Sequence, residues 1–307
     1  MNNEKKTTAP ARETVGRKPI DPVVVTSYVV LALGTIAVII PFWLLIMGSV
    51  TEEMELIVNG YSFWPGAFSA AAYEYLFANA AYLGRAYGIT IFVTVVGTVV
   101  SLIITTMLGY VLSRSTLPGR KILNFLVVFT MLFNGGLVPS YLIYTTTFGI
   151  KNTIWALIVP QLLMSAFNIM LARNFFTTSI PYAIIEAATI DGASEFTTFT
   201  KVVLPLSLPI MATIGLFVGV TYWNDWKNGM YYINKSHLYG IQNVLNQMLG
   251  NLQFLKSNAD AAAAAVELPS GGVRMAIACV AVVPILMAYP FFQKYFVKGI
   301  SIGAVKE

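Results

Sequence analysis

Six long apolar stretches constrain the fold of this chain more than any other feature of its sequence. A helix needs about 20 mostly apolar residues to cross the hydrocarbon core of a membrane, and each stretch is of that length. Only 11% of the 307 residues are charged, whereas soluble domains carry roughly 25%. The sequence therefore predicts an all-α, polytopic membrane protein with six transmembrane helices, over residues 23–47, 87–112, 122–144, 154–172, 203–223 and 273–292.

The distribution of basic residues predicts which way these helices cross the membrane. With six spans both termini lie on one side, and that side holds 13 of the 19 Lys and Arg residues. Because cytoplasmic segments carry the excess of Lys and Arg, both termini are expected in the cytoplasm. The net charge of +5 then reflects membrane topology and does not indicate a nucleic-acid partner.

This topology divides the chain into five segments. Residues 1–22 are polar and basic and are expected to form a disordered cytoplasmic tail. Residues 23–48 are too long for the apolar part of a signal peptide and are expected to remain as the first transmembrane helix. An outer loop over residues 49–86, a core over residues 87–296 and a cytoplasmic C-terminal tail over residues 297–307 complete the predicted organisation.

A polar interruption between the fourth and fifth stretches, residues 180–209, has its own helix signals. Pro181 suits the first turn of a helix, and good helix formers follow it. Gly192 permits a sharp turn, and Ser194 can cap a second helix that passes into the next apolar stretch at Pro205. The loop is predicted to form a cytoplasmic helix, a turn and a second helix between two spans.

The spacing within this loop resembles the cytoplasmic EAA loop of the permease subunits of bacterial binding-protein-dependent ABC importers, the MetI-like inner-membrane components. That loop has Glu-Ala-Ala, three residues, Gly, nine residues, an aliphatic residue, one further residue and Leu-Pro. The corresponding residues here are Glu186, Ala187, Ala188, Gly192, Val202, Leu204 and Pro205. Only Val202 departs from the pattern, because isoleucine is commoner there. Six fixed identities coincide on the order of once in a million start positions.

The resemblance implies a role and a set of partners. In the family the first helix of the loop sits in a groove on the ATP-binding subunit and couples that subunit to the membrane helices. Small alanines permit a close approach, and the carboxylate of Glu186 can meet a basic residue of the partner. The implied ATPase-coupling residues are Glu186, Ala187, Ala188, Asp191, Gly192, Leu204 and Pro205. The implied partners are a homologous second permease, two ATP-binding subunits, an extracytoplasmic solute-binding protein and membrane lipid. The alternative is an interfacial helix pair with no partner.

Other segments resemble the carbohydrate branch of this family. They are residues 132–139, 149–153, Pro160, residues 167–168 and the C-terminal residues 289–299 and 303–306. In that branch the terminal segment reaches between the ATP-binding subunits, which implies a second contact here. A basic stop-transfer tail is the alternative. The resemblance implies import of a carbohydrate, with an amino acid, peptide or lipid precursor as the other substrate classes.

Polar residues within or beside the spans are candidates for a substrate path. The sequence Asn134-Gly135-Gly136 interrupts the third stretch, and non-helical backbone is tolerated in a membrane where it lines a cavity. Trp223, Asn224 and Trp226 combine aromatic faces with an amide, which suits contact with a sugar, although an aromatic belt at the membrane surface explains the tryptophans equally well. The candidate path residues are Asn134, Gly135, Gly136, Asn168, Trp223, Asn224 and Trp226. Hydrogen bonds between helices are the alternative role for Asn168, Gln161, Ser101, Thr105 and Thr106.

The second outer segment, residues 224–272, contains apolar side chains at helical spacing from Ile241 to Leu255. Polar side chains, including Asn243, occupy the opposite face, so this part is predicted to be an amphipathic helix. The helix either lies on the outer leaflet or covers the translocation path, and the surface position is favoured.

Several function classes lack the residues that they need. No ionisable residue lies well inside a predicted span, whereas proton-coupled carriers use an intramembrane relay. One histidine and no acidic pair at metal-ligand spacing leave a metalloenzyme or membrane hydrolase without ligands, so no catalytic residue, metal or cofactor is expected. No Gly-Lys-Ser/Thr occurs, so ATP must bind another polypeptide. The prediction is a multi-pass permease of the bacterial cytoplasmic membrane, and the alternative is an ATP-independent channel or carrier.

Overall fold

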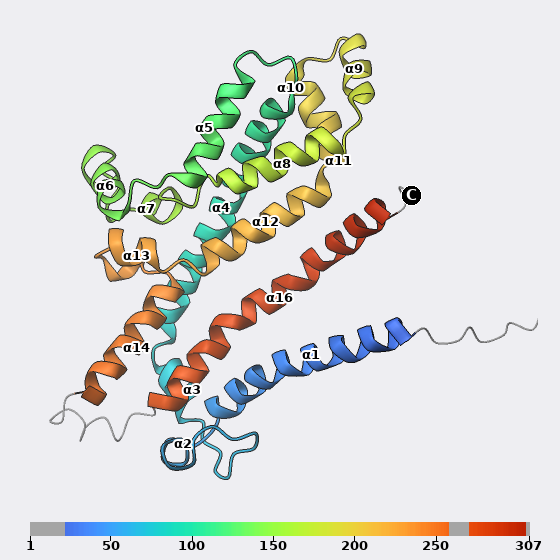
Figure 1. Cartoon of the computed structure of the whole chain (residues 1–307). Coiled ribbons are helices and arrows are strands. Elements are labelled where there is room, and N and C mark those ends of the chain that lie inside the picture. The colour runs from blue at the N-terminus through green and yellow to red at the C-terminus, as the bar shows by residue number, and fades with distance from the viewer. Residues whose placement is uncertain (1–21, 258–269, 305–307) are drawn as a thin grey trace, which may run out of the picture.

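The computed structural model describes residues 22–257 and 270–304, and most of them are helical. Most of the predicted N-terminal tail and the last three residues lie outside this part. No strand occurs in the described part, where one isolated antiparallel bridge joins Thr51 to Phe68. Three long helices run through the molecule, namely α1 (Pro22–Ser49), α4 (Ala80–Ser113) and α16 (Ser270–Ala304) (Figure 1). The prediction of an all-helical protein is confirmed.

Shorter helices connect and cover the long ones. The segment after α1 contains α2 (Glu53–Asn59) and α3 (Ala71–Ala78). The middle of the chain contains α5 (Arg120–Leu132), α6 (Leu137–Leu142), a π-helix (Ile143–Thr147), α7 (Trp155–Ile158) and α8 (Ala166–Thr178). After the loop helices described below come α12 (Leu208–Trp223), α13 (Lys227–Tyr232), a 3-10 helix (Ser236–Leu238) and α14 (Ile241–Ser257).

Two helices in the described part, α1 and α4, are long and apolar enough to cross a membrane unaided. At 34 residues, α4 is ~51 Å long, which exceeds the ~30 Å hydrocarbon core. The number of candidate spans rises to four if each of two bent helix pairs is one span. The α5–α6 pair bends by 112° and the pair that ends in α12 bends by 82°. A further apolar helical segment covers Gly271–Met287.

The breaks in the middle of the chain have local causes. Gly136 has φ +91°, a left-handed conformation that favours glycine, and residues 133–136 are not helical. This confirms the interruption predicted at Asn134-Gly135-Gly136. The prediction of one continuous helix over residues 154–172 is wrong. Helix ends at Ile158 and resumes at Ala166, and Gln161 between them has φ +62°.

The central core lies where α4, α8 and α12 pack together. Lipid tails are as apolar as a leucine side chain, so helices in a membrane associate mainly through close packing and hydrogen bonds. Gly97 of α4 lies against the ring of Tyr222, and Gly109 lies against Ala172. The hydroxyl of Tyr222 donates a hydrogen bond of 2.8 Å to the carbonyl oxygen of Ile158. Small residues therefore let the three helices approach closely.

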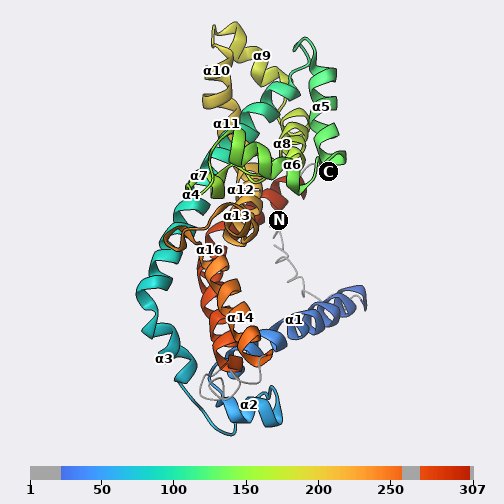
Figure 2. The ribbon, with the colours of Figure 1, turned by 90° about the vertical axis from the view of Figure 1, so that its left-hand side faces the viewer.

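A second core occupies the opposite end of the molecule from α9 and α10 (Figures 1 and 2). There the start of α4 and the start of α16 pack with α3 and α14. Ile241, Val244 and Leu245 are buried on α14, so the predicted apolar stripe is present. Asn243 is also buried, although it was predicted on the polar face, and its amide donates to the Trp226 carbonyl oxygen at 2.7 Å. The apolar stripe of α14 from Ile241 to Leu245 thus packs on protein.

The α2–α3 segment is attached to α16 through a carboxylate. Both oxygens of Glu53 accept hydrogen bonds from the backbone N–H of Gly271, at 2.8 and 2.9 Å, and one also accepts from Gly272 at 3.1 Å. A carboxylate at the N-terminus of a helix satisfies unpaired donors and complements the helix dipole. The segment after α1 is thus a structured cap and not an open loop.

Candidate ATPase-coupling loop and translocation path

The loop between α8 and α12 folds as the sequence predicts. Its first helix is α9 (Tyr182–Ile190), and Pro181 precedes it in an extended conformation. Gly192 turns the chain with φ +80°, and no atom lies within 4 Å of the position of a Cβ there. The second helix, α10 (Glu195–Thr198), begins after Ser194, whose hydroxyl accepts a hydrogen bond of 3.2 Å from the backbone N–H of Thr197. The helix–turn–helix prediction is confirmed.

The passage from this loop into α12 is irregular. A π-helix (Phe199–Val203) follows α10, and the short α11 (Leu204–Leu206) follows the π-helix. Leu204 is half-buried and Pro205 is exposed. Ser207, at the bend, is fully buried and its hydroxyl donates to the Val203 carbonyl oxygen at 2.7 Å. The Leu-Pro pair thus stands at the base of the loop, away from the tip formed by α9.

The tip of the loop presents a mixed apolar and acidic surface. Glu186 and Ala187 are exposed and Ala188 is half-buried, while Asp191 and Gly192 are exposed at the turn. Ile190 and Tyr182 are 80% and 54% exposed. The carboxylate of Glu186 has no hydrogen-bond or ion-pair partner among the described residues. Neighbouring exposed apolar side chains are typical of a surface that another protein or a membrane covers.

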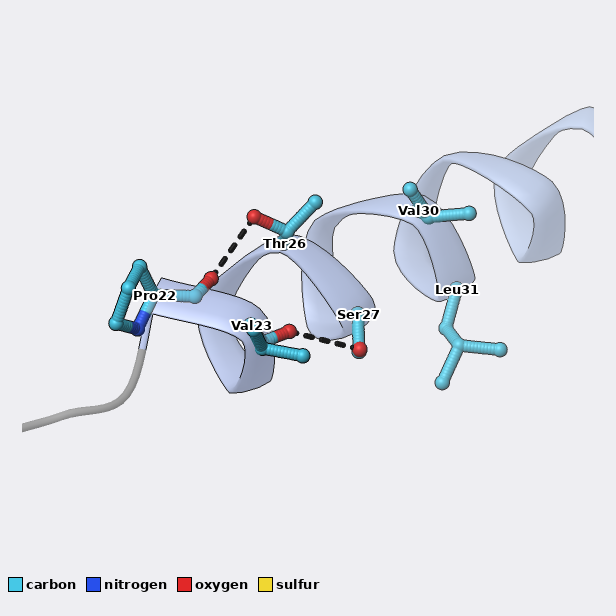
Figure 3. A pocket seen from close by; sticks show the side chains of 6 residues that line it. All are labelled: Pro22, Val23, Thr26, Ser27, Val30 and Leu31. Carbon is cyan, nitrogen blue, oxygen red and sulfur yellow. Dashed lines mark hydrogen bonds between the residues drawn. The ribbon is translucent and has the colours of Figure 1, made fainter.

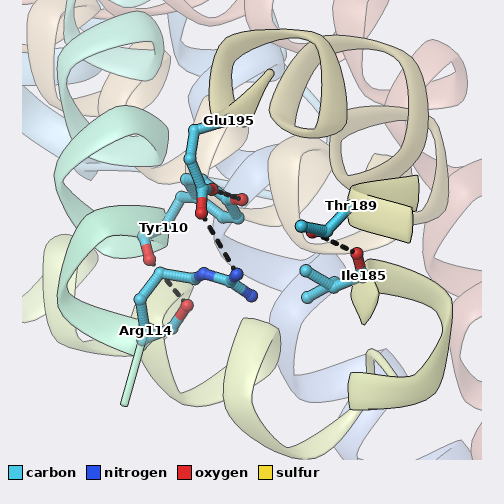
Figure 4. A network of polar contacts seen from close by, with 6 residues as sticks. Tyr110, Arg114, Ile185, Thr189 and Glu195 are labelled. Carbon is cyan, nitrogen blue, oxygen red and sulfur yellow. Dashed lines mark hydrogen bonds and ion pairs between the residues drawn. The ribbon is translucent and has the colours of Figure 1, made fainter. Parts of the chain in front are cut away.

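The base of the loop is bonded to the end of α4. The hydroxyl of Tyr110 donates to one carboxylate oxygen of Glu195 at 2.6 Å, and the guanidinium of Arg114 contacts the other at 3.2 Å (Figure 4). Within α9, the hydroxyl of Thr189 donates a hydrogen bond of 3.0 Å to the carbonyl oxygen of Ile185. Sequence reasoning gave Tyr110, Arg114 and Glu195 no role. The partners of Glu195 lie 81 and 85 positions away, and no local pattern joins them.

The candidate path residues lie on three separate parts of the chain. Asn134, Gly135 and Gly136 are exposed between α5 and α6, where the side-chain oxygen of Asn134 accepts from the Gly136 N–H at 2.9 Å. Asn168 is buried near the start of α8. Asn224 is exposed after α12, and its side-chain oxygen lies 3.4 Å from the amide nitrogen of Gln242.

The two tryptophans of the predicted path differ in exposure. Trp223 is 7% exposed, and its indole N–H donates to the Ala281 carbonyl oxygen of α16 at 3.3 Å. Its ring lies 6.3 Å from that of Tyr87. Trp226 is 37% exposed. Trp223 therefore belongs to the packing of α12 against α16 and offers no free face to a sugar, whereas Trp226 does.

Asp225 lies between the two tryptophans. Burial raises the pKa of its carboxyl, and hydrogen bonds from the backbone N–H groups of Asn228 and Lys227 oppose that rise. These bonds are 3.3 and 3.1 Å long. The carboxylate accepts from the first two backbone N–H groups of α13 and holds the turn after α12.

Neither the start of α1 nor the acidic side chains form a second site in the described part of the chain. The first residues of α1 border a shallow hollow (Figure 3), but the hydroxyls of Thr26 and Ser27 donate to the carbonyl oxygens of Pro22 and Val23 at 2.8 Å, so its hydroxyl groups are satisfied within the helix. Among the described residues, no group of three or more His, Cys, Asp or Glu side chains is arranged to hold a metal ion.

Known proteins are similar to this chain in sequence and in fold. A family model described as "Binding-protein-dependent transport system inner membrane component" matches residues 105–302. Protein LplC of Bacillus subtilis (strain 168) is 40% identical over 279 residues, which cover 90% of this chain and 93% of LplC. The polygalacturonan/rhamnogalacturonan transport system permease protein YtcP of the same organism is 38% identical over 279 residues, with 91% and 96% covered.

A solved structure agrees with these matches. It belongs to a bacterial ABC transporter involved in the import of the acidic polysaccharide alginate. The likeness has a TM-score of 0.77 and 28% sequence identity, and covers 92% of this chain and all of that one. The alternative of an ATP-independent channel or carrier is thereby set aside. The chain belongs to the inner-membrane components of binding-protein-dependent transport systems, and it is a multi-pass permease subunit of an ABC importer.

Proposed function

We propose that this permease crosses the membrane six times with both termini in the cytoplasm. The six spans are α1, α4, the bent α5–α6 pair, α7 with α8, α12 and α16. The bends at residues 133–136 and 159–165 make the third and fourth spans discontinuous, which a membrane tolerates where the free backbone faces protein or a cavity. The α9–α10 loop and the α2–α3 segment lie at opposite ends of the molecule, which supports their assignment to opposite sides of the membrane (Figure 1).

The coupling role rests on one observation, the exposed carboxylate of Glu186 on α9, which has no partner within residues 22–257 and 270–304. The surface around it combines small residues, which let a partner approach, with exposed apolar side chains, which gain from burial. The expected partners are two ATP-binding subunits, one of which receives α9 in a groove. Closure of these subunits on ATP displaces α9, and the displacement alternates the spans between outward and inward opening.

The proposed cargo is an oligosaccharide delivered by an extracytoplasmic solute-binding protein, and a homologous second permease completes the pathway. The support comes from relatives, because YtcP is named for polygalacturonan and rhamnogalacturonan and the solved transporter for alginate. Polygalacturonan and alginate are both chains of uronic acids. Uronic-acid oligosaccharides are therefore the first substrates to test, with neutral oligosaccharides as the comparison.

Co-purification with the candidate ATP-binding subunit tests the coupling role. Native chain is compared with Glu186→Lys, which places a cation where an anion is expected, and with Glu74→Gln, an exposed acid on α3. We expect native chain and Glu74→Gln to retain the ATP-binding subunit and Glu186→Lys to lose it while still inserting in the membrane. Failure of the native chain to recruit any ATPase would overturn the proposal.

Substrate class is tested in proteoliposomes that contain the complete importer and its binding protein. ATP hydrolysis is measured with short oligogalacturonides and with short neutral arabino-oligosaccharides. We expect at least one of the two to stimulate hydrolysis. Stimulation by neither, with a working binding protein present, would contradict the carbohydrate assignment and direct the search to amino acids, peptides or lipid precursors.

A further inference from the structure

Arg114 lies at the C-terminal end of α4 and contacts both helices of the coupling loop. Its guanidinium is 3.2 Å from a carboxylate oxygen of Glu195, the first residue of α10. The central carbon of this guanidinium, Cζ, lies 5.8 Å from the ring centroid of Tyr182, the first residue of α9. Cations are attracted to aromatic faces at that distance. One side chain of α4 thus holds the beginnings of both loop helices.

Tyr110 occupies the other half of the same contact. It is 5% exposed, and its hydroxyl donates at 2.6 Å to the second carboxylate oxygen of Glu195. Its ring lies 5.1 Å from that of Phe199 and 6.5 Å from that of Phe176. A short hydrogen bond to a carboxylate is among the stronger and more directional contacts in proteins. Both oxygens of Glu195 are therefore used by residues of α4 (Figure 4).

The contact is distinctive within the described part of the chain, where Arg114–Glu195 is the one ion pair. Glu186 and Asp191, the other acids of the loop, make no ion pair there. The side chain of Arg114 is 13% exposed and that of Glu195 is 67% exposed. The fixed half of the contact thus belongs to α4 and the solvent-facing half belongs to the loop. Apolar contacts such as those of Phe199 can slide, whereas a carboxylate held by two directional donors sets one orientation.

Helix α4 continues from this contact to the far end of the molecule. Near its other end, the Thr90 hydroxyl accepts a hydrogen bond of 2.8 Å from the backbone N–H of Ile241 in α14. Tyr87 donates from its hydroxyl to the Val280 carbonyl oxygen of α16 at 2.8 Å. A rigid helix bonded at both ends connects the coupling loop to the outer part of the protein.

We propose that Arg114 and Tyr110 are positioning residues that fix the coupling loop to α4 through Glu195, so that the loop and α4 move as one body when the ATP-binding subunits close. This inference rests on the coupling role proposed for α9. It adds the residues by which that movement enters the membrane helices. Arg114, Tyr110 and Glu195 are proposed to act through the orientation of α9 and not through contact with the cargo or ATP.

Distance measurement by electron paramagnetic resonance tests this rigid connection in the complete importer. Spin labels are placed on Ile184→Cys, on the side of α9 opposite Glu186, and on Ile103→Cys in α4, both exposed positions, with Cys279→Ser to remove the native thiol. The label-to-label distance is measured without nucleotide and after trapping with ATP and vanadate. In the native background we expect the same distance in both states.

Three variants separate the parts of the contact. Glu195→Gln removes the charge, Tyr110→Phe removes only the hydroxyl while keeping the buried ring, and Arg114→Lys keeps the charge but loses the planar guanidinium. We expect Glu195→Gln to broaden the distance distribution and to shift it on ATP trapping, with several-fold less oligogalacturonide taken up per ATP hydrolysed. Tyr110→Phe should show the same shift in smaller measure, and Glu74→Gln should match the native background.

The outcomes distinguish the two proposals. If native chain recruits the ATP-binding subunits but Glu195→Gln and Tyr110→Phe keep the native distance in both states, the positioning role is overturned and the coupling role stands. Equal losses of assembly, hydrolysis and uptake, with the distance unchanged, would also overturn it, because they indicate a purely structural role. If native chain recruits no ATP-binding subunit, the coupling role fails and this inference fails with it.

Discussion

Tyr222 lies so close to Gly97 that a Cβ on that glycine would stand 2.5 Å from the ring carbon Cζ. Tyr222 is 2% exposed, so its ring has no free space into which it can move. The absence of a side chain at one position of α4 is what allows α12 to approach it. This relationship determines the packing of the two helices on which the middle of the permease depends.

Replacing Gly97 by valine should force α4 and α12 apart. Overpacking a well-packed site costs about 1–3 kcal/mol, and displacement of Tyr222 would also weaken its hydrogen bond to Ile158. We expect a lower melting temperature in detergent and poorer yield. Gly84→Val is the matched control, because no atom lies within 4 Å of a Cβ at that glycine of the same helix. Equal stability of the two variants would show that the close contact is not maintained in solution.

Gly192 should tolerate asparagine better than valine. Its φ of +80° is unfavourable for L-residues by roughly 1–2 kcal/mol, and asparagine is among the residues that adopt such angles most readily. Because a Cβ there meets no neighbour, backbone strain is the sole cost. The measurement is retention of the ATP-binding subunit, for which we expect the order Gly, Asn, Val. A Val variant that retains the subunit as well as native chain does would argue against a fixed turn.

Asp225 should make stability depend on pH in a defined direction. Burial raises the pKa of its carboxyl above the ordinary value of 3.8, so the folded state binds the proton more tightly than the unfolded state. Its contribution to stability is therefore largest at acidic pH and is lost as pH rises from 3.8 through the raised pKa. Asp225→Asn, which keeps an oxygen for the two backbone donors, should be at least as stable as native chain at neutral pH.

The check on Asp225 is the melting temperature of both proteins across that pH range. We expect the difference between them to shrink as pH falls, because the native carboxyl then becomes neutral like the amide. A native protein that loses stability relative to the variant on acidification would reverse the sign and show that hydrogen bonding to the carboxylate outweighs burial.

Trp223 and Trp226 should separate stability from transport. Trp223→Phe loses the bond from the indole to Ala281, which is worth about 1 kcal/mol, and should lower the melting temperature. Trp226→Ala removes a ring that is 37% exposed and should lower the melting temperature too, so uptake is measured per amount of folded protein. If Trp226 meets the sugar, its loss should reduce oligosaccharide uptake by roughly 2- to 10-fold, since contacts of an aromatic ring are worth about 0.5–1.5 kcal/mol. Unchanged uptake would remove Trp226 from the path.

Local chemistry determined much of this protein in advance. Helices α9 and α10, the turn at Gly192, the cap at Ser194 and the break at Asn134-Gly135-Gly136 all follow from the backbone preferences of a few neighbouring residues. The spacing from Glu186 to Pro205 also predicted the family, and the matches to known permeases confirm that prediction. The roles of the individual loop residues and the count of six spans remain predictions.

Tertiary structure decided where helices break, which side chains are buried and which distant residues are in contact. An apolar stretch is equally compatible with a straight helix and a broken one. The break around Gln161 could therefore not be predicted from the hydropathy of residues 154–172. The sequence suggests an exposed ring for Trp223 at the end of a span, but α16 covers this side chain. The contact of Glu195 with Tyr110 and Arg114 joins positions more than 80 residues apart. Hydropathy and backbone preference act over a few residues, whereas burial and ion pairing depend on which helices meet, and only packing in three dimensions sets that.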